Sequence, residues 1–205
     1  MKTLTTNPLF RVSRMVLALL AFAGCGGSEK KGPVRLNVAC AASFTEVMDE
    51  ASKAYLEQTG TVVECEYGSS GALARKVAEG APVDLFVSAN LQWVQFLRDN
   101  GRVAPDGGVI LARNSLVCVV PAGADAVPGS AAELASLERV ALGDPQHVPA
   151  GIYARQALTN LGVWDSLSGR DRLVLSQDVR AVLSLVEQGA VSAGLVYATD
   201  ALASV

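Results

Sequence analysis

Two serines stand between two glycines in the stretch "YGSSGALARK", residues 67–76. The stretch leads directly into a helix-like run, and serines in such a place can do two kinds of chemistry. Ser69 or Ser70 could attack a substrate as a nucleophile, or the hydroxyls and backbone N–H groups could hold an anion at the helix start. The rest of the chain decides between these hypotheses, because a nucleophile needs a general base and an anion site does not.

The nucleophile hypothesis lacks partners in the sequence. The nucleophile elbow of α/β hydrolases has the spacing G-x-S-x-G, and this stretch is one residue shorter. The only histidine of the chain is His147, in "GDPQHVPAG", and no pattern pairs it with Ser69 or Ser70. The phosphate-binding patterns G-x-x-x-x-G-K-[ST] and G-x-G-x-x-G are also absent. We therefore interpret His147 as a surface or structural residue and keep a serine hydrolase as the weaker alternative.

The anion hypothesis finds further support along the chain. Small residues join a strand-like run to a helix-like run at three places, residues 41–43, 68–71 and 148–151, and a fourth helix starts at residues 178–179. In open α/β sheets, ligands bind beyond the carboxyl ends of strands, at helix N-termini. Several such N-termini meeting at one point would form a pocket in which neutral donors fix the size and geometry of a small anion.

Strand-like and helix-like runs alternate from Pro33 onward. The runs "VRLNVACAA", "TVVECEY" and "VDLFVSA" are strand-like, and the alternation restarts after "VAPDGG" with "SLVCVVPA" and ends with "SAGLVYAT". This series indicates an α/β fold. We expect two lobes, each a mainly parallel sheet flanked by helices, at residues 34–112 and 113–198. The ligand would lie in the cleft between them, and the chain would cross near residues 109–114.

The first helix-like run can be described in more detail. Ser43 followed by Glu46 fits a capping box at its start. Its apolar residues recur with helical spacing, which predicts one buried face made of Phe44, Val47, Met48, Ala51 and Tyr55.

The N-terminal residues have the pattern of an export signal. Basic residues precede the short apolar run "MVLALLAFAG", which is well below the roughly 20 residues of a membrane-spanning helix. We interpret residues 1–24 as a signal peptide and residues 25–33 as a flexible tether. The stretch "FAGC" resembles the lipobox of bacterial lipoproteins, in which Cys25 would be lipidated. We expect an exported protein in the periplasm or on the outer face of the cell membrane. An ordinary cleaved signal with an incidental cysteine is the alternative.

Composition excludes several classes of partner. The net charge is −3 with 17 basic residues, and aromatic residues make up 5% of the chain, so we expect no nucleic-acid surface. Cys40, Cys65 and Cys118 form no CxxC pair, and with one histidine they predict no metal-cation site and no cofactor. Cys40 and Cys65 both end strand-like runs and could form a disulfide, although free cysteines within strands are the simpler interpretation.

Four stretches together resemble a known family. They are "ACAASFTEVMDEASKAY", "YGSSGALARKVAEGAPVDLFVSAN", "GDPQHVPAGIYARQAL" and "QDVRAVLSLVEQGAVSAGLVYATDA". In order and spacing they are similar to periplasmic molybdate-binding proteins, the substrate-binding subunits of molybdate importers of the ABC type. The resemblance implies a two-lobed periplasmic binding protein of the type II kind that is not an enzyme. It implies a monomer that binds molybdate or tungstate and delivers it to a membrane permease.

The resemblance also implies a set of ligand-binding residues. The ion would be held by hydroxyls and backbone N–H groups alone, contributed by Ser43, Ser70, Ala150, Val179 and Tyr197. Asp84, Asn90 and Asp178 lie near these motifs, and we interpret them as structural supports. The family usually has an aspartate where Asn90 stands.

The resemblance departs from the family at the C-terminal end. Relatives continue for a few dozen residues, so we expect residues 199–205 to begin a return segment whose remainder, part of lobe 1, is missing. Two alternatives to a molybdate or tungstate receptor follow. The chain could bind another tetrahedral oxyanion, such as sulfate or phosphate, or it could be a truncated remnant without function.

Overall fold

The computed structural model describes residues 33–169 and 171–204. The predicted signal peptide and the lipidation site Cys25 lie outside the described residues, as does the tether up to residue 32. Within the described part of the chain, no helix is both long enough and apolar enough to cross a membrane. The described residues from Pro33 onward form one compact unit that contains two sheets.

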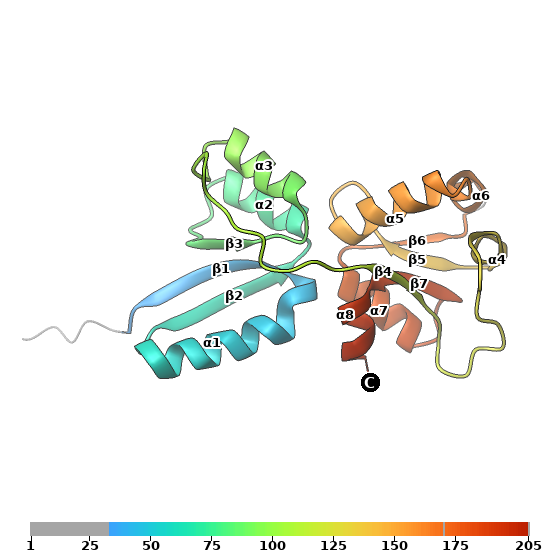
Figure 1. Ribbon diagram of the computed structural model, residues 1–205, viewed down its shortest axis with the longest axis horizontal. Coiled ribbons are helices and arrows are strands. Elements are labelled where there is room, and N and C mark those ends of the chain that lie inside the picture. Colours follow the sequence, from blue (N-terminus) through green and yellow to red (C-terminus); the bar gives the residue numbers. More distant parts are fainter. Residues whose placement is uncertain (1–32, 170, 205) are drawn as a thin grey trace, which may run out of the picture. The chain divides into compact units, whose positions relative to one another are not determined.

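The first sheet, with its helices, is called lobe 1. Its three strands are all parallel and lie in the order β2-β1-β3: β1 is Arg35–Ala41, β2 is Val62–Gly68 and β3 is Leu85–Val87. A short 3-10 turn, η2 (Ala42–Phe44), leads into the first of three helices. These helices are α1 (Thr45–Thr59), α2 (Ser70–Ala78) and α3 (Leu91–Asp99). Helices α2 and α3 lie on one face of the sheet and α1 lies on the other (Figure 1).

The second sheet, with its helices, is called lobe 2. Its strands lie in the order β4-β7-β5-β6: β4 is Leu116–Val119, β5 is Val140–Gly143, β6 is Leu173–Ser176 and β7 is Ala193–Tyr197. Only β4 runs antiparallel to its neighbour. The helices are α4 (Ala131–Ser136), α5 (Pro149–Asn160), α6 (Trp164–Ser168), α7 (Val179–Glu187) and α8 (Ala198–Ala203).

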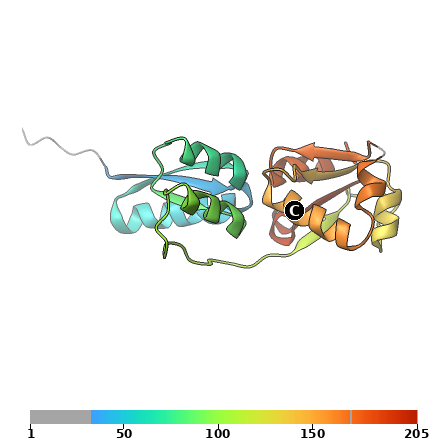
Figure 2. The same cartoon turned by 90° about the horizontal axis from the view of Figure 1, so that it is seen from above.

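The predicted fold class is confirmed, since both sheets are mainly parallel and flanked by helices. The chain passes from α3 to β4 through the long irregular segment that Figure 2 shows, and this segment contains the predicted crossing at residues 109–114. The final helix, α8, packs against α7, β4 and β7. The predicted lobe boundaries and the predicted return segment stay predictions.

The lobe 2 core has two apolar layers, one on each face of the sheet. The central strands β5 and β7 are buried along their whole length, as expected for parallel strands covered on both faces. One layer includes Val182 and Val186 of α7, and the other includes Leu158 and Leu167 from the α5–α6 side. This core fixes the carboxyl ends of β5, β6 and β7 relative to the helices that follow them.

The face predicted for α1 is only partly correct. Phe44 and Met48 pack against the β1–β2 side of the lobe 1 sheet. Val47 is 63% exposed and Tyr55 is 43% exposed, and no residue of α1 is fully buried. The sheet beneath this helix has only three strands, so α1 is covered along a narrow line and not over a broad face.

The capping box predicted at Ser43 is wrong. The chain forms the 3-10 turn η2 before α1 begins, so the residue at the N-cap is Phe44, and no side chain caps the helix. This shift in the helix start separates Ser43 from the capping position. Glu46 instead pairs with Arg180 of lobe 2.

All three cysteines in the described part of the chain are free. The β1–β2 register sets Cys40 opposite Tyr67 and Cys65 opposite Val38, so the two cysteines are diagonal neighbours. Diagonal neighbours lie about 7–8 Å apart, whereas a disulfide usually needs Cα atoms within about 6.8 Å. The simpler interpretation of free cysteines within strands therefore agrees with the register.

Candidate anion-binding site

The five residues predicted to bind a ligand all line one pocket. Four lie at the start of the helix or 3-10 turn that follows a parallel strand (β1, β2, β5 or β6), and the fifth is the last residue of β7: Ser43, Ser70, Ala150, Val179 and Tyr197. The pocket holds about 210 Å³ of space free of protein atoms, including the part open to solvent. Because this volume includes space open to solvent, it is an upper limit, and the pocket suits a ligand of a few atoms.

The serine pair at the start of α2 is held by backbone N–H groups. Ser69 is the N-cap, and its hydroxyl accepts a hydrogen bond from the Ala72 N–H at 3.3 Å. The Ser70 hydroxyl, fully buried, accepts from the Ala89 N–H at 2.9 Å. A serine hydroxyl that accepts a bond still has its own hydrogen to donate. The Ser70 side chain is thus fixed as a donor at the pocket.

Two backbone N–H groups at helix starts belong to the same pocket. Ala150 is the second residue of α5, after Pro149, which has no N–H, and Val179 is the first residue of α7. The first N–H groups of a helix have no partner within the helix. The Asp178 carboxylate caps α7 by accepting from the Ala181 N–H at 2.9 Å, which leaves the Val179 N–H uncommitted. Both helix starts therefore present donors and the positive ends of helix dipoles.

Tyr197 supplies a buried hydroxyl. The residue is 6% exposed, and its phenol oxygen has no hydrogen-bond partner in the described part of the chain. Burial, followed by the nearby charges of Tyr153 and Asp200, raises the pKa of Tyr197 above its ordinary value of 10, so the O–H keeps its proton at neutral pH. Leaving a buried donor unpaired costs about 1–3 kcal/mol. An acceptor atom in the pocket would remove that cost.

Lobe 1 contributes one more hydroxyl through Ser43. The residue lies in η2 and is half-buried, and its hydroxyl makes no hydrogen bond to another described residue. Among the described lining residues, Asp178 is the only charged one, and its carboxylate is engaged as a helix cap. No group of three metal-ligating side chains occurs in the described residues. A pocket lined by neutral donors fits an oxyanion better than a cation.

The other residues singled out from the sequence have structural roles. The Asp84 carboxylate accepts from the Asn37 N–H at 2.8 Å, and the Asn90 amide oxygen caps α3 by accepting from the Trp93 N–H at 3.2 Å. The His147 Nδ1 atom lies 3.7 Å from the Asp144 carboxylate. In the described residues, no hydrogen bond joins the His147 ring to Ser69 or Ser70, so the arrangement of a nucleophile and its base is not formed.

Sequence reasoning missed two residues at this site. The Gly71 N–H donates to the His147 carbonyl at 3.1 Å, which joins α2 of lobe 1 to the β5–α5 turn of lobe 2. A Cβ atom at Gly71 would lie 2.4 Å from that carbonyl oxygen, so only glycine allows this approach. Arg180 of "QDVR" reaches Glu46 of lobe 1. Gly71 lies in "YGSSGALARK" and Arg180 in "QDVR", but only neighbouring residues of these two motifs were predicted to bind the ligand.

Two α/β lobes with a donor-lined pocket at the carboxyl ends of both sheets define the class of two-lobed solute-binding proteins. The model of the family described as "Bacterial extracellular solute-binding protein" matches residues 36–204. The chain belongs to this family.

Relatives within the family are similar over most of the chain. The putative ABC transporter substrate-binding lipoprotein YvgL of Bacillus subtilis is 41% identical in an alignment of length 204 that covers 95% of this chain and 77% of that protein. The molybdate-binding protein ModA of Escherichia coli is 39% identical in an alignment of length 193 that covers 91% of this chain and 74% of that protein. The resemblance to molybdate-binding proteins is therefore confirmed.

A solved structure agrees with the sequence relatives. The periplasmic molybdate-binding protein of Azotobacter vinelandii superimposes with a TM-score of 0.71 at 29% identity and covers 79% of this chain and 71% of its own. The sulfate-binding protein SubI of Mycobacterium tuberculosis, 18% identical with a TM-score of 0.69, shares the fold. The periplasmic binding protein fold is thereby confirmed.

Proposed function

We propose that this chain captures molybdate, or the nearly equal-sized tungstate, as the substrate-binding component of an ABC importer. The observation that carries the proposal is the set of five positions around one small pocket, which supply hydroxyls and helix-start N–H groups without a positively charged lining residue. The unpaired, buried phenol oxygen of Tyr197, a residue that lines this pocket, also supports it. The names of the relatives supply the identity of the ion.

The proposed ion would contact both lobes at once. Ser43 and Ser70 would donate from lobe 1, and the Ala150 and Val179 N–H groups with the Tyr197 phenol would donate from lobe 2. Hydrogen bonds to a charged acceptor contribute about 1.5–3 kcal/mol each. Because the full set exists only when the lobes are together, the ion would favour that arrangement. Sulfate is smaller and would reach fewer donors at a time, so we expect it to bind more weakly.

Thermal unfolding of the purified protein with added oxyanions tests this proposal. A ligand at one hundred times its dissociation constant stabilises the folded state by about 2.7 kcal/mol. We expect molybdate and tungstate to raise the midpoint and sulfate and phosphate to raise it far less. If sulfate or phosphate instead raises the unfolding midpoint most, the protein is a receptor for a different oxyanion. A cooperative transition that ignores all four ions would support a remnant without function.

We also propose that the protein is exported, is anchored through a lipid on Cys25, and passes its ion to a membrane permease. The stretch "FAGC" supports the anchor, and so does the description of the Bacillus subtilis relative as a lipoprotein. Metabolic labelling with a radioactive fatty acid tests it. The wild-type protein should carry the label in the membrane fraction, and Cys25→Ser should lose it. Equal labelling of both proteins would contradict the anchor at Cys25.

A further inference from the structure

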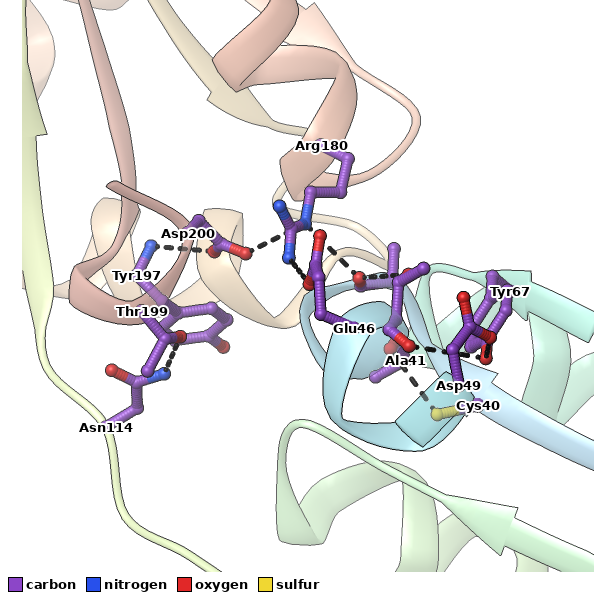
Figure 3. Close-up of polar contacts among 12 residues, drawn as sticks. Cys40, Ala41, Glu46, Asp49, Tyr67, Asn114, Arg180, Tyr197, Thr199 and Asp200 are labelled. Carbon is purple, nitrogen blue, oxygen red and sulfur yellow. Dashed lines mark hydrogen bonds and ion pairs between the residues drawn. The ribbon is translucent and has the colours of Figure 1, made fainter. Parts of the chain in front are cut away.

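Arg180 lies in the first turn of α7, next to Val179 at the pocket, and its guanidinium contacts oxygens of both lobes (Figure 3). Its Nη2 atom pairs with the Glu46 carboxylate of lobe 1. Its Nε atom lies 3.4 Å from the Ala42 carbonyl oxygen of lobe 1 and 3.1 Å from Asp200 Oδ1 of lobe 2. Ala42 itself lines the pocket.

The Arg180–Glu46 pair differs from the other ion pairs of the described residues because it alone joins lobe 1 to lobe 2. Arg35–Glu64 and Lys76–Glu66 each join two elements of lobe 1, and His147–Asp144 lies within one loop of lobe 2. An ion pair inside a lobe cannot depend on how the lobes are arranged. The Arg180–Glu46 pair does depend on it.

Asp200 positions the guanidinium from its own lobe. This carboxylate is fully buried, and its Oδ2 atom accepts from the Tyr197 N–H at 3.1 Å. The Oδ1 contact with Arg180 is an ion pair and not a well-directed hydrogen bond. Asp200 therefore connects the backbone of Tyr197, a residue that lines the pocket, to the side chain that reaches lobe 1.

We propose that Arg180, held by Asp200, is a positioning residue that latches lobe 2 to lobe 1 through Glu46 and the Ala42 carbonyl when the oxyanion is bound. This inference rests on the proposed function. The latch fixes the spacing between the lobe 1 donors and the lobe 2 donors, so it increases affinity without touching the ion. The Gly71–His147 backbone hydrogen bond is a second point at which the lobes meet.

Simple electrostatics makes the opposite prediction for Glu46. A carboxylate near an anion site repels the anion, and Glu46 lies two residues after η2, whose Ala42 and Ser43 line the pocket. If Glu46 acted only as a charge, its removal would strengthen molybdate binding. If Glu46 is the lobe 1 half of a latch, its removal weakens binding. The sign of the change therefore separates the two accounts.

The test is isothermal titration of molybdate into the wild-type protein, Glu46→Gln and Glu64→Gln. Glu64→Gln is the matched control, because it removes the same charge and also breaks an exposed ion pair, but one that lies within lobe 1. Exposed or partly exposed ion pairs contribute modestly, so we expect Glu46→Gln to weaken binding about two- to fivefold. Glu64→Gln should stay within about twofold of the wild type. High salt should reduce the difference between Glu46→Gln and wild type, since it screens the pair.

A double-mutant cycle with Arg180→Lys identifies the partner of Glu46. Lysine keeps a positive charge beside Asp200 but loses the fork that spans the two lobes. Glu46→Gln should weaken binding less in the Arg180→Lys background than in the wild type. The ligand-free unfolding midpoint of Glu46→Gln should match that of the wild type, because the Glu46 side chain is 54% exposed.

The outcomes separate the latch from the proposed function. If the wild-type protein binds molybdate and Glu46→Gln binds it equally well or more tightly, the latch is overturned and the proposed function stands. Equal weakening by Glu64→Gln would likewise overturn the latch. If the wild-type protein binds no oxyanion, the proposed function fails, and the latch fails with it as a device for ligand capture.

Discussion

The phenol of Tyr197 is buried at the pocket and has no hydrogen-bond partner in the described part of the chain, so its O–H contributes nothing to the ligand-free fold. We expect Tyr197→Phe to weaken molybdate binding about ten- to a hundredfold, the loss of one hydrogen bond to a charged acceptor. The ligand-free unfolding midpoint should stay the same or rise. Titration calorimetry and thermal unfolding measure the two effects. Tyr153→Phe, at a tyrosine that packs on the same core outside the pocket lining, is the control. A lower midpoint with unchanged affinity would show that Tyr197 is only structural.

A second prediction for a single residue concerns Asp200 and the way in which the stability of the protein depends on pH. Burial raises its pKa from 3.8 to about 6, while Arg180 and the Tyr197 N–H lower it and Glu46 and Asp178 raise it. The folded state therefore holds this proton more tightly than the unfolded state. The stabilisation that comes from this tighter proton binding is fully present below about pH 4 and is lost as the pH rises through about 6. Above that pH, Asp200 causes no further change in the unfolding free energy. The stabilisation is at most about 3 kcal/mol, from 1.36 kcal/mol per pKa unit.

Urea unfolding at several pH values, with Asp200→Asn as the comparison, measures this contribution. The unfolding free energy of the wild type, measured relative to that of Asp200→Asn, should be larger at pH 4 than at pH 6. Parallel pH curves for the two proteins would mean that the pKa of Asp200 is not raised.

At the scale of elements, the start of α2 meets the β5–α5 turn at Gly71. A Cβ atom there would lie 2.4 Å from the His147 carbonyl oxygen and 2.6 Å from Cζ2 of Trp93. Gly71→Ala should weaken molybdate binding by at least about tenfold, because it adds a clash of about 1–3 kcal/mol and disturbs a hydrogen bond. Gly129→Ala is the control, since Gly129 lies outside the pocket lining and its Cβ would meet only Glu133 Oε2, at 3.7 Å. Equal affinities for the two variants in calorimetry would contradict a required close approach at Gly71.

The same elements show what the sequence could and could not predict. The turns after β1, β2 and β5 were recognisable because small residues between a strand-like and a helix-like run are a local pattern. The 3-10 turn at Ala42–Phe44 was missed, since Ser43 and Glu46 satisfy the local rule for a capping box equally well. The exposure of Val47 and Tyr55 depends on how many strands lie beneath α1, which periodicity does not reveal.

At the scale of the whole molecule, the fold class followed from the alternation of runs, but the contacts between the lobes did not. Arg180 and Glu46 are 134 positions apart in the sequence. Their pairing depends on the tertiary arrangement, as does that of Gly71 with the His147 carbonyl. No local pattern distinguishes Arg180 from an ordinary solvated arginine of a first helical turn. The identity of the ion came from resemblance, because neutral donors define a size and a shape but no particular element.

The central claim is that donors from both lobes surround one oxyanion, and a crystal structure of the protein with molybdate tests it most directly. Anomalous scattering locates the molybdenum atom without reference to the protein. We expect one strong peak in the pocket, with oxyanion oxygens about 2.7–3.1 Å from the hydroxyls of Ser43, Ser70 and Tyr197 and from the Ala150 and Val179 amide nitrogens. A peak elsewhere, contacts with only one lobe, or no peak at saturating molybdate would contradict the account.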